Sequence, residues 1–481
     1  MELNLEEQTK KILDSFHSVN DLVIREIRTE FCNGNIFYID GMIDANELYM
    51  SVVKPLVEAN KAFDFDLKGI NGVLTCSSKI MSISDFEKIL YFIAGGDAVL
   101  LIDKASTFIM IGVRRPNSRT TSEPPTSTAI KGPREGFVED IKSNVLLIRR
   151  KLKTNDFMYE PCIVGRKTQT NIYVCYLKGV ANIEIVEKVI KRINTIDVDG
   201  VVDSSQIGKY LEEKPYSIFK QIGNNEKPDV IADKMLDGKI AIIVEGSPIV
   251  LTIPYVLLDD FEAVQDNYKR NARVNFVRLI RLCAVIFAVY LPAAFVAVQA
   301  YHYEIIPPKL LLTMLNAIEG VPFSPIIEML IAVVLFEILG ETSIRMPRYV
   351  GMALSVVGAL VLGETAVSAG LLSSITVLIV ALSGIGIYSI PDDVGSFSLL
   401  RIIFVLIAGV MGLYGVILVT IIVAIYLFDF EEYGVPYLVP LSPLFKKEML
   451  SFVFKPTIKD EIVRPRYLNL KNKTKQKKII D

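Results

Sequence analysis

The sequence predicts a soluble N-terminal α/β region of two subdomains followed by a C-terminal α-helical transmembrane bundle. Two runs carry the membrane part of this prediction: Leu282–Tyr301 has 20 residues without a charge, and Ile402–Phe428 has 27. Each is long enough to cross about 30 Å of hydrocarbon at about 1.5 Å per residue. Before residue 270, short strand-like runs alternate with helical patterns, as in α/β domains.

Composition excludes several classes of function. The 481 residues are 51% hydrophobic and 22% charged, with a net charge of -2, so there is no overall attraction to nucleic acid. The five cysteines are odd in number and form no CxxC pair, which disfavours a disulfide framework. Only two histidines occur, and no catalytic or phosphate-binding motif is present. We therefore expect no enzyme activity, no cofactor and no metal.

The first subdomain is expected over residues 1–155. Helical patterns cover residues 5–16 and 46–65. Residues 98–113, AVLLIDKASTFIMIGV, predict two strands joined by a turn. The Pro-, Ser- and Thr-rich residues 114–128 cannot form part of a core, so we expect an exposed connector there.

The second subdomain is expected over residues 156–270. Asn171–Leu177 and Lys239–Val244 have the composition of strands, and Ile183–Ile193 has the periodicity of a helix. The apolar residues 248–258 are expected to lead the chain to the membrane.

The transmembrane domain is expected over residues 275–430. A basic cluster precedes its first span and places that side in the cytoplasm: Lys269, Arg270, Arg273, Arg278 and Arg281. Pro325–Leu339 carries two acids and suits a helix of the bundle interior or a re-entrant helix. Residues 349–363 and 366–390 are two further apolar segments, and Ile402–Phe428 is expected to be the last span.

Residues 431–481 are expected to form a basic cytoplasmic tail, because residues 446–481 contain eleven Lys or Arg and four acids. With both ends inside, we expect four full spans and one re-entrant or interfacial segment. The sequence shows no internal repeat, which disfavours a secondary transporter.

Acidic residues within apolar segments are candidates for function, because a carboxylate in hydrocarbon costs about 2.5–3.5 kcal/mol on insertion scales. Glu328, Glu337 and Glu364 should face protein or water and could line a pore or relay protons. Glu328 and Glu337 are nine residues apart and should point to opposite faces of one helix. The alternative for Glu337 is a structural clamp with neighbouring charges (Glu341, Arg345 and Arg348).

Two sets of small residues predict close helix packing, within one chain or between subunits: Gly351, Ser355 and Gly358, and then Gly409, Gly412 and Gly415. Helix packing is favoured over pore lining for both sets. Asp392 and Asp393 follow Pro391 and are interpreted as a solvated loop rather than a charged pore mouth.

Gly132–Asp140, GPREGFVED, follows the connector. Gly132 and Pro133 predict a turn, and Glu139 and Asp140 are placed in the first turn of a helix, where its dipole favours carboxylates. The simplest interpretation is a well-formed helix in a domain interface. We expect this turn to contribute to a contact between subunits or subdomains, through Gly132, Pro133, Arg134, Glu135, Gly136 and Phe137.

This string resembles the signature of the spore germination receptor A-subunit family of endospore-forming bacteria, the GerA type. Further strings occur in the family's order over residues 90–430: Glu123-Pro124, Lys227-Pro228-Asp229, Asp237-Gly238-Lys239, Glu245-Gly246-Ser247-Pro248, Gln265-Asp266-Asn267-Tyr268, Val321–Pro325, Arg345-Met346-Pro347 and Val357–Ser373. Five residues differ from those usual in the family: Ser127, Lys131, Lys227, Asn267 and Glu364.

The resemblance implies a nutrient-triggered germination receptor in the spore inner membrane. Such A subunits work with a permease-like B subunit and a lipoprotein C subunit, and are thought to form a ring around an ion conduit. The alternative is a scaffold that assembles these partners without conducting ions. Composition and spacing alone imply none of these functions.

Overall fold

The protein forms two compact units, which we describe separately. The α/β unit contains the residues up to Glu213, Ile222–Pro254 and those from Lys459 on, and the membrane unit contains Lys214–Gln221 and Tyr255–Ile458. The computed structural model describes residues 5–17, 21–29, 33–58, 73–74, 80–103, 107–114, 132–262, 266, 268–345, 350, 357–358, 360–389 and 393–476. The expected connector at 114–128 lies almost wholly outside these residues.

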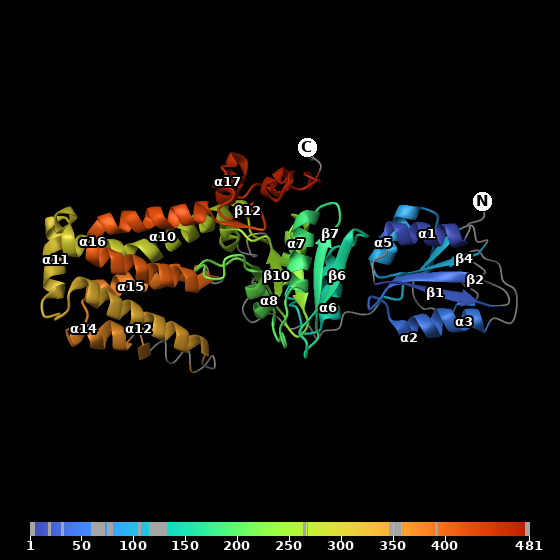
Figure 1. Cartoon of the computed structure of the whole chain (residues 1–481), viewed down its shortest axis with the longest axis horizontal. Coiled ribbons are helices and arrows are strands. Elements are labelled where there is room, and N and C mark those ends of the chain that lie inside the picture. The colour runs from blue at the N-terminus through green and yellow to red at the C-terminus, as the bar shows by residue number, and fades with distance from the viewer. Residues whose placement is uncertain are drawn as a thin grey trace. The chain divides into compact units, whose positions relative to one another are not determined.

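The first half of the α/β unit is a five-stranded antiparallel sheet in the order β1-β2-β4-β5-β3. Its strands are Leu22–Arg28, Asn33–Ile39, Ile80–Ile83, Ala98–Ile102 and Phe108–Ile111 (β1 to β5). Its helices are α1 (Leu5–Ser15), α2 (Ala45–Leu48), η1 (Tyr49–Val53), α3 (Lys54–Val57) and α5 (Phe86–Ala94). β4 and β5 pair as the hairpin that the sequence predicted. The helices cover both faces of the sheet, with α1 and α5 on one face and α2 and α3 on the other (Figure 1).

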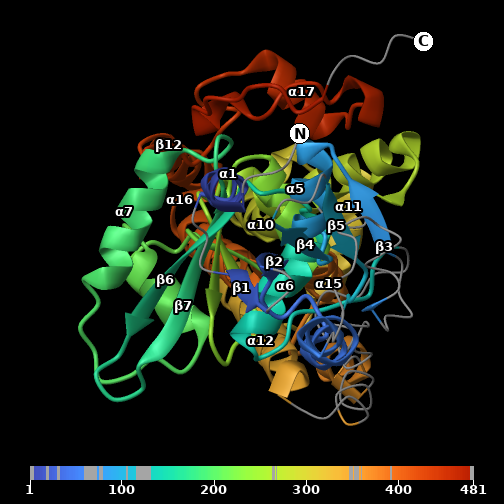
Figure 2. The same ribbon diagram turned by 90° about the vertical axis from the view of Figure 1, so that its right-hand side faces the viewer.

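The second half is another five-stranded antiparallel sheet, in the order β6-β7-β9-β10-β8. Its strands are Phe157–Val164, Thr170–Leu177, Gly223–Asn225, Ile240–Val244 and Val250–Ile253 (β6 to β10). Its helices are α6 (Ile141–Lys151), α7 (Ile183–Asn194), α8 (Ser204–Leu211) and α9 (Pro228–Leu236). The predicted strands at β7 and β9 and the predicted helix α7 are confirmed, and α7 lies along β6 and β7 (Figure 2).

The two sheets have the same strand order, although the sequence showed no internal repeat. In each sheet the first and second strands are neighbours, and the third strand of the chain forms the far edge. Residues 248–258 do lead the chain into the membrane unit, which it enters at Tyr255, but they first form β10, the strand that pairs with β9 inside the second sheet. The strand order is held by backbone hydrogen bonds, which most side chains can accompany. Two sheets can therefore share a strand order without sharing a recognisable sequence.

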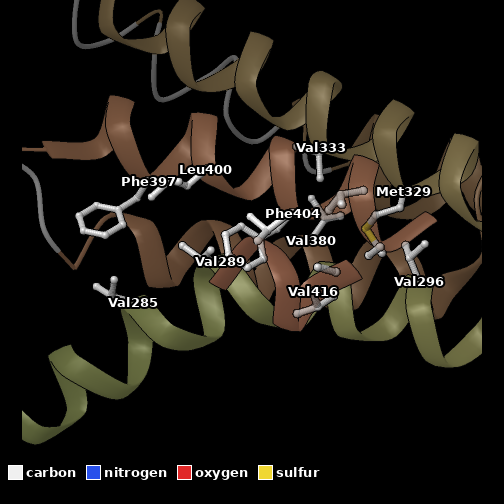
Figure 3. Packing of buried hydrophobic residues seen from close by; sticks show 14 of the residues in the cluster. Val285, Val289, Val296, Met329, Val333, Val380, Phe397, Leu400, Phe404 and Val416 are labelled. Carbon is white, nitrogen blue, oxygen red and sulfur yellow. The ribbon is translucent and has the colours of Figure 1, made fainter. Parts of the chain in front are cut away.

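The membrane unit is a bundle of apolar helices, and the fold class predicted from the sequence is confirmed. Its helices are η2 (Leu257–Phe261), α10 (Asn271–Tyr301), η4 (Tyr303–Ile305), α11 (Pro308–Ile318), α12 (Pro325–Arg345), η5 (Val361–Thr365), α14 (Ala366–Ser368), α15 (Ser374–Ile387), α16 (Val394–Phe428) and α17 (Lys446–Val453). Two short strands, β11 (Glu431–Glu432) and β12 (Val435–Pro436), lie between α16 and α17 in the chain. In the described part of the chain, α10 and α16 are long and apolar enough to cross a membrane. Side chains from α10, α12, α15 and α16 form its core (Figure 3).

The last span is not one straight helix, which corrects the expectation for Ile402–Phe428. α16 is interrupted at Gly412, whose backbone angles (φ 62°, ψ -151°) are not helical. A Cβ on Gly415 would meet the Ile407 side chain at 2.8 Å, although eight residues of straight helix would separate these positions by about 12 Å. Tyr301, at the end of α10, donates a hydrogen bond to the carbonyl oxygen of Gly409 at 2.8 Å. α16 is therefore a helical hairpin that turns at Gly412, near the end of α10.

Another expected apolar segment, residues 366–390, is also divided. α14 ends at Ser368, Gly370 adopts φ 68°, and α15 begins at Ser374. A positive φ suits glycine because it has no Cβ, so Gly370 provides a turn within this apolar stretch.

The expected tail, residues 431–481, is divided between the units: residues up to Ile458 belong to the membrane unit, and those from Lys459 on group with the α/β unit. Arg464 donates from Nε to the carbonyl oxygen of Leu236 at 2.7 Å, and Lys475 pairs with Asp237 at 2.7 Å. Leu470 lies against Gly238, where a Cβ would come within 2.7 Å of its side chain. The part of the tail from Lys459 on therefore docks on the end of α9.

Candidate functional site

A fully buried arginine lies inside the membrane unit. Arg401, on the first arm of α16, donates from Nη2 to the carboxylate of Glu337 on α12 and from Nη1 to Oγ of Ser383 on α15 at 3.0 Å. Ser383 in turn donates to the carbonyl oxygen of Ala288 on α10 at 2.6 Å, and Ser398 donates to Glu337 at 2.6 Å. One polar network thus joins four helices.

The two charges of this network differ in exposure. The side chain of Arg401 is 1% exposed, whereas that of Glu337 is 34% exposed. A buried guanidinium is stable in an apolar bundle only when it is paired, so Glu337 holds Arg401 in place. About a third of the Glu337 side chain is therefore open to the outside of the unit, whereas Arg401 is enclosed.

The partner of Glu337 differs from the expected one. Arg345 pairs with Glu341 at 2.6 Å, and both side chains are exposed. Arg348 lies outside the described residues. Sequence reasoning missed Arg401, although one signal was available: it directly precedes a charge-free run and follows the apolar Leu399 and Leu400.

Glu328 has a separate environment, as the nine-residue spacing predicted. It is 1% exposed, and its Oε1 accepts a hydrogen bond from the backbone N–H of Ser373 at 2.7 Å. Ser373 is the N-cap of α15 and its Oγ accepts from the N–H of Thr376. A carboxylate at a helix N-terminus is stabilised by the unpaired N–H groups and the helix dipole. This contact gives Glu328 a structural role within the chain.

Glu364 is exposed, unlike Glu328. It lies in η5, a single π-helical turn, and Gly363 and Thr365 beside it are also exposed. Single π-helical turns are rare in proteins, and many of those that occur are found at functional sites. Of the three acids predicted as pore or relay residues, Glu364 alone is exposed in the described structure and has no structural partner among the described residues.

The packing glycines have different surroundings. A Cβ on Gly409 would meet the Ile326 side chain at 2.1 Å, and one on Gly358 would meet Leu339 at 2.8 Å, so both allow close approach to α12. Gly415 lies in a tight contact with Met411, near the turn of the hairpin. For Gly412 the expectation of a packing position on one continuous helix is corrected, because it forms the turn itself. Gly351 lies outside the described residues.

The Gly132–Phe137 turn, expected within the first subdomain, packs against residues of the second. Phe137 is buried, and its N–H donates to the carbonyl oxygen of Glu226 at 2.9 Å. Lys227 donates from Nζ to the carbonyl oxygen of Pro133 at 3.4 Å, and Glu135 pairs with Lys151 at 3.0 Å. Two strings that carried the family resemblance therefore meet in space.

The helix after this turn begins at Ile141, so Glu139 and Asp140 precede it instead of lying in its first turn. Asp140 is the N-cap of α6, accepting from the N–H of Ser143 at 2.8 Å, and Glu139 precedes the helix. The hydrogen bonds from Ser143 hold the pKa of Asp140 below its usual value. Buried Asn144 accepts from the N–H of Val138 and donates to its carbonyl oxygen, which fixes the turn to the helix.

Comparison with known proteins identifies the family. The profile described as "Bacillus/Clostridium GerA spore germination protein" matches residues 10–467. This chain belongs to the GerA family.

Similar GerA-family and related proteins cover almost the same length. Spore germination protein GerLA of Bacillus cereus is 35% identical over 98% of this chain and 97% of its own, and spore germination protein KA of Bacillus subtilis (strain 168) is 32% identical over 98% and 87%. The uncharacterized membrane protein YfkQ of B. subtilis is 33% identical over 94% and 88%. A crystal structure of the N-terminal domain of the A subunit of the Bacillus megaterium spore germinant receptor GerK3 matches with a TM-score of 0.40 at 26% identity, over 52% of this chain and 96% of that domain.

In this GerA-family chain, two arginines of the basic cluster lie within α10, before its charge-free run, and are engaged in contacts. Arg278 pairs with Asp266 at 3.3 Å and Glu262 at 3.2 Å, and it donates to the carbonyl oxygen of Phe452 at 2.8 Å. Arg281 pairs with Asp266 at 3.5 Å. These contacts fix the start of α10 to α17, and they leave the bias of Lys and Arg toward this side of the span unchanged.

Proposed function

We propose that this chain is the A subunit of a nutrient-responsive spore germination receptor, and that copies of it assemble around an ion conduit in the spore inner membrane. Membership of the GerA family and the helical membrane unit support the receptor part of this proposal. A permease-like B subunit and a lipoprotein C subunit are its proposed partners.

The proposal of an ion conduit rests on the exposure of Glu364. In lipid an exposed carboxylate would cost about 2.5–3.5 kcal/mol on insertion scales. Glu364 must therefore face water or another subunit, and a water-filled passage between copies meets both requirements. Glu337, with one side open and the other bound to Arg401, is a second candidate for this surface.

The docked tail supports one orientation. Because Arg464 and Lys475 bind the end of α9, the tail and the α/β unit lie on the same side of the membrane. The basic residues before the charge-free part of α10 favour the cytoplasmic side, which is the core of the spore.

The Gly132–Phe137 turn remains a proposed assembly element. Its contacts with Glu226 and Lys227 lie within one subdomain, but α6 directly after it reaches the first subdomain through Arg149. Replacing the exposed Arg134 with Ala should reduce assembly of the receptor on native gels; unchanged assembly would count against the proposal.

Ion flux through proteoliposomes that contain the assembled receptor tests the conduit. Glu364→Gln should lower triggered cation flux, whereas Glu319→Gln, which removes another exposed carboxylate at the end of α11, should leave it unchanged. Equal flux from both variants would remove Glu364 from the pathway.

The second candidate function is a scaffold without a conduit. It is favoured by the hydrogen bonds of Glu328 and Glu337 within the chain, because these two of the three candidate pore acids already have structural partners. A scaffold gives no flux in any triggered state, even when the partner subunits are assembled on it.

A further inference from the structure

Both ends of the α16 hairpin lie beside the segment Lys214–Gln221, at one end of the membrane unit. At the second end, Tyr426 stacks on Phe219 with ring centroids 6.0 Å apart. At the first end, Asp393 precedes the helix and is close enough to Lys220 for the lysine charge to act on it. The base of the hairpin is therefore built around this segment.

A buried polar cluster fills this base. Lys220 pairs with Asp260 at 3.7 Å, and Tyr255 donates from its hydroxyl to Asp260. Tyr437 donates from its hydroxyl to the carbonyl oxygen of Lys220 at 2.7 Å. The Lys220 ammonium lies 5.4 Å from the centre of the Tyr255 ring. The lysine is thus directed toward Asp260 in this structure.

Asp393 lies next to this cluster and is 7% exposed, which corrects its interpretation as part of a solvated loop. Its Oδ1 accepts a hydrogen bond from the Ser396 hydroxyl, a neutral group. Its Oδ2 is buried and has no hydrogen-bond partner among the residues that the structure describes. A buried carboxylate with one neutral donor is costly while it is ionised.

Opposing influences act on the Asp393 carboxyl. Burial, the largest of them, and the negative charge of Asp260 favour the neutral acid, whereas Ser396 and the positive charge of Lys220 favour the carboxylate. Burial prevails, and the pKa of Asp393 rises from 3.8 to about 7. Among the described residues, the other titratable groups that face the cluster are Tyr255, Tyr437, Asp259 and Glu432. Both tyrosines have a pKa raised by burial and stay neutral.

We propose that Asp393 is a proton-binding site at the base of the α16 hairpin, and that its proton is exchanged when the segment Lys214–Gln221 moves. With Lys220 on Asp260, Asp393 keeps its proton. When Lys220 turns to Asp393, the new ion pair stabilises the carboxylate and the proton leaves to solvent. This segment is joined covalently to Glu213 and Ile222 of the α/β unit, and it contacts the hairpin through Phe219 and Tyr426, so movement of that unit can reach the hairpin through it.

Infrared titration of the purified full-length chain in detergent tests the site. The carbonyl stretching band of a protonated carboxyl group should disappear with a midpoint near pH 7 and be absent in Asp393→Asn. A band that Asp393→Asn leaves unchanged, or an Asp393 midpoint near its ordinary value of about 4, would overturn the proposal.

Two neighbouring substitutions test the coupling and do not require Asp393→Asn to fold. Asp260→Asn removes a negative charge and should move the midpoint to lower pH, whereas Lys220→Gln removes a positive charge and should move it to higher pH. Shifts in the same direction, or no shift, would reject the coupling to Lys220 and Asp260.

The free energy of unfolding should depend on pH through the proton on Asp393. Between about pH 4 and about pH 7 the native chain holds the proton and the unfolded chain does not, so stability falls as the pH rises and levels off above about pH 7. The unfolding equilibrium constant should change by about tenfold per pH unit within this window, an effect that Asp393→Asn abolishes. Equal pH dependence in both proteins would contradict the site. These measurements need no ion flux, so they are independent of the conduit.

Discussion

Each unit contains a fully buried arginine, Arg149 in the α/β unit and Arg401 in the membrane unit. Arg149 pairs with Asp21 at 2.7 Å and lies 4.8 Å from the centre of the Phe157 ring. Asp21 is 9% exposed, so this pair is sealed on both sides. The partner of Arg401, Glu337, is open on one side. The first arrangement can only hold structure together, whereas the second leaves a charge that water or another subunit can reach.

The largest expected effect comes from breaking the sealed pair. Arg149→Met leaves Asp21 buried without its cation and should lower the free energy of unfolding by about 3–5 kcal/mol, measured by urea denaturation of the full chain. Arg150→Met on the same helix, where the side chain is half-buried, is the matched control and should change it by less than about 0.5 kcal/mol. Similar losses in the two variants would show that the Asp21 pair is not the cause.

Repairing the sealed pair is the next test. Arg149→Met combined with Asp21→Leu removes both charges and should recover most of the loss, because an apolar pair of similar volume is often as stable as a buried ion pair. The coupling between the two substitutions should reach about 0.5–3 kcal/mol in a double-mutant cycle. Simple addition of two losses would argue for separate roles.

Breaking the open pair should have a smaller effect. Arg401→Met leaves Glu337 able to reach water, and polar contacts between helices in bilayers contribute about 0.6 kcal/mol on average and up to about 1.7 kcal/mol. We expect a loss of about 1–2 kcal/mol in thermal unfolding followed by near-ultraviolet circular dichroism, which suits a chain with 20 tyrosines and no tryptophan. A loss as large as that of Arg149→Met would mean that Glu337 is sealed in the membrane.

The smallest effect is expected for an exposed pair. Arg166 and Asp197 pair through side chains that are 64% and 68% exposed. Arg166→Gln should leave the denaturation midpoint unchanged within error, because water solvates both groups when they separate. A clear shift would show that burial does not decide the strength of ion pairs in this chain.

Local pattern was sufficient where a single segment sets its own structure. The β4–β5 hairpin, β7, β9 and α7 follow from alternation and helical periodicity, and α10 follows from its length without charge. The pattern failed at α16, because a glycine inside an apolar run fits a straight helix and a turn equally well. It was incomplete at 248–258, where the residues before Tyr255 form the buried strand β10 and those from Tyr255 on enter the membrane unit.

The sequence by itself determined that the chain has an α/β part and a lipid-dependent part, and it carried the strings of the GerA family. Hydrophobicity and periodicity are local properties, so one segment contains that information. Only the tertiary structure decided that Glu337 pairs with Arg401, that Asp393 is buried, that α16 turns at Gly412 and that the tail binds α9. Each of these depends on which distant segments meet, because the energy of a charge or a turn depends on what surrounds it after packing.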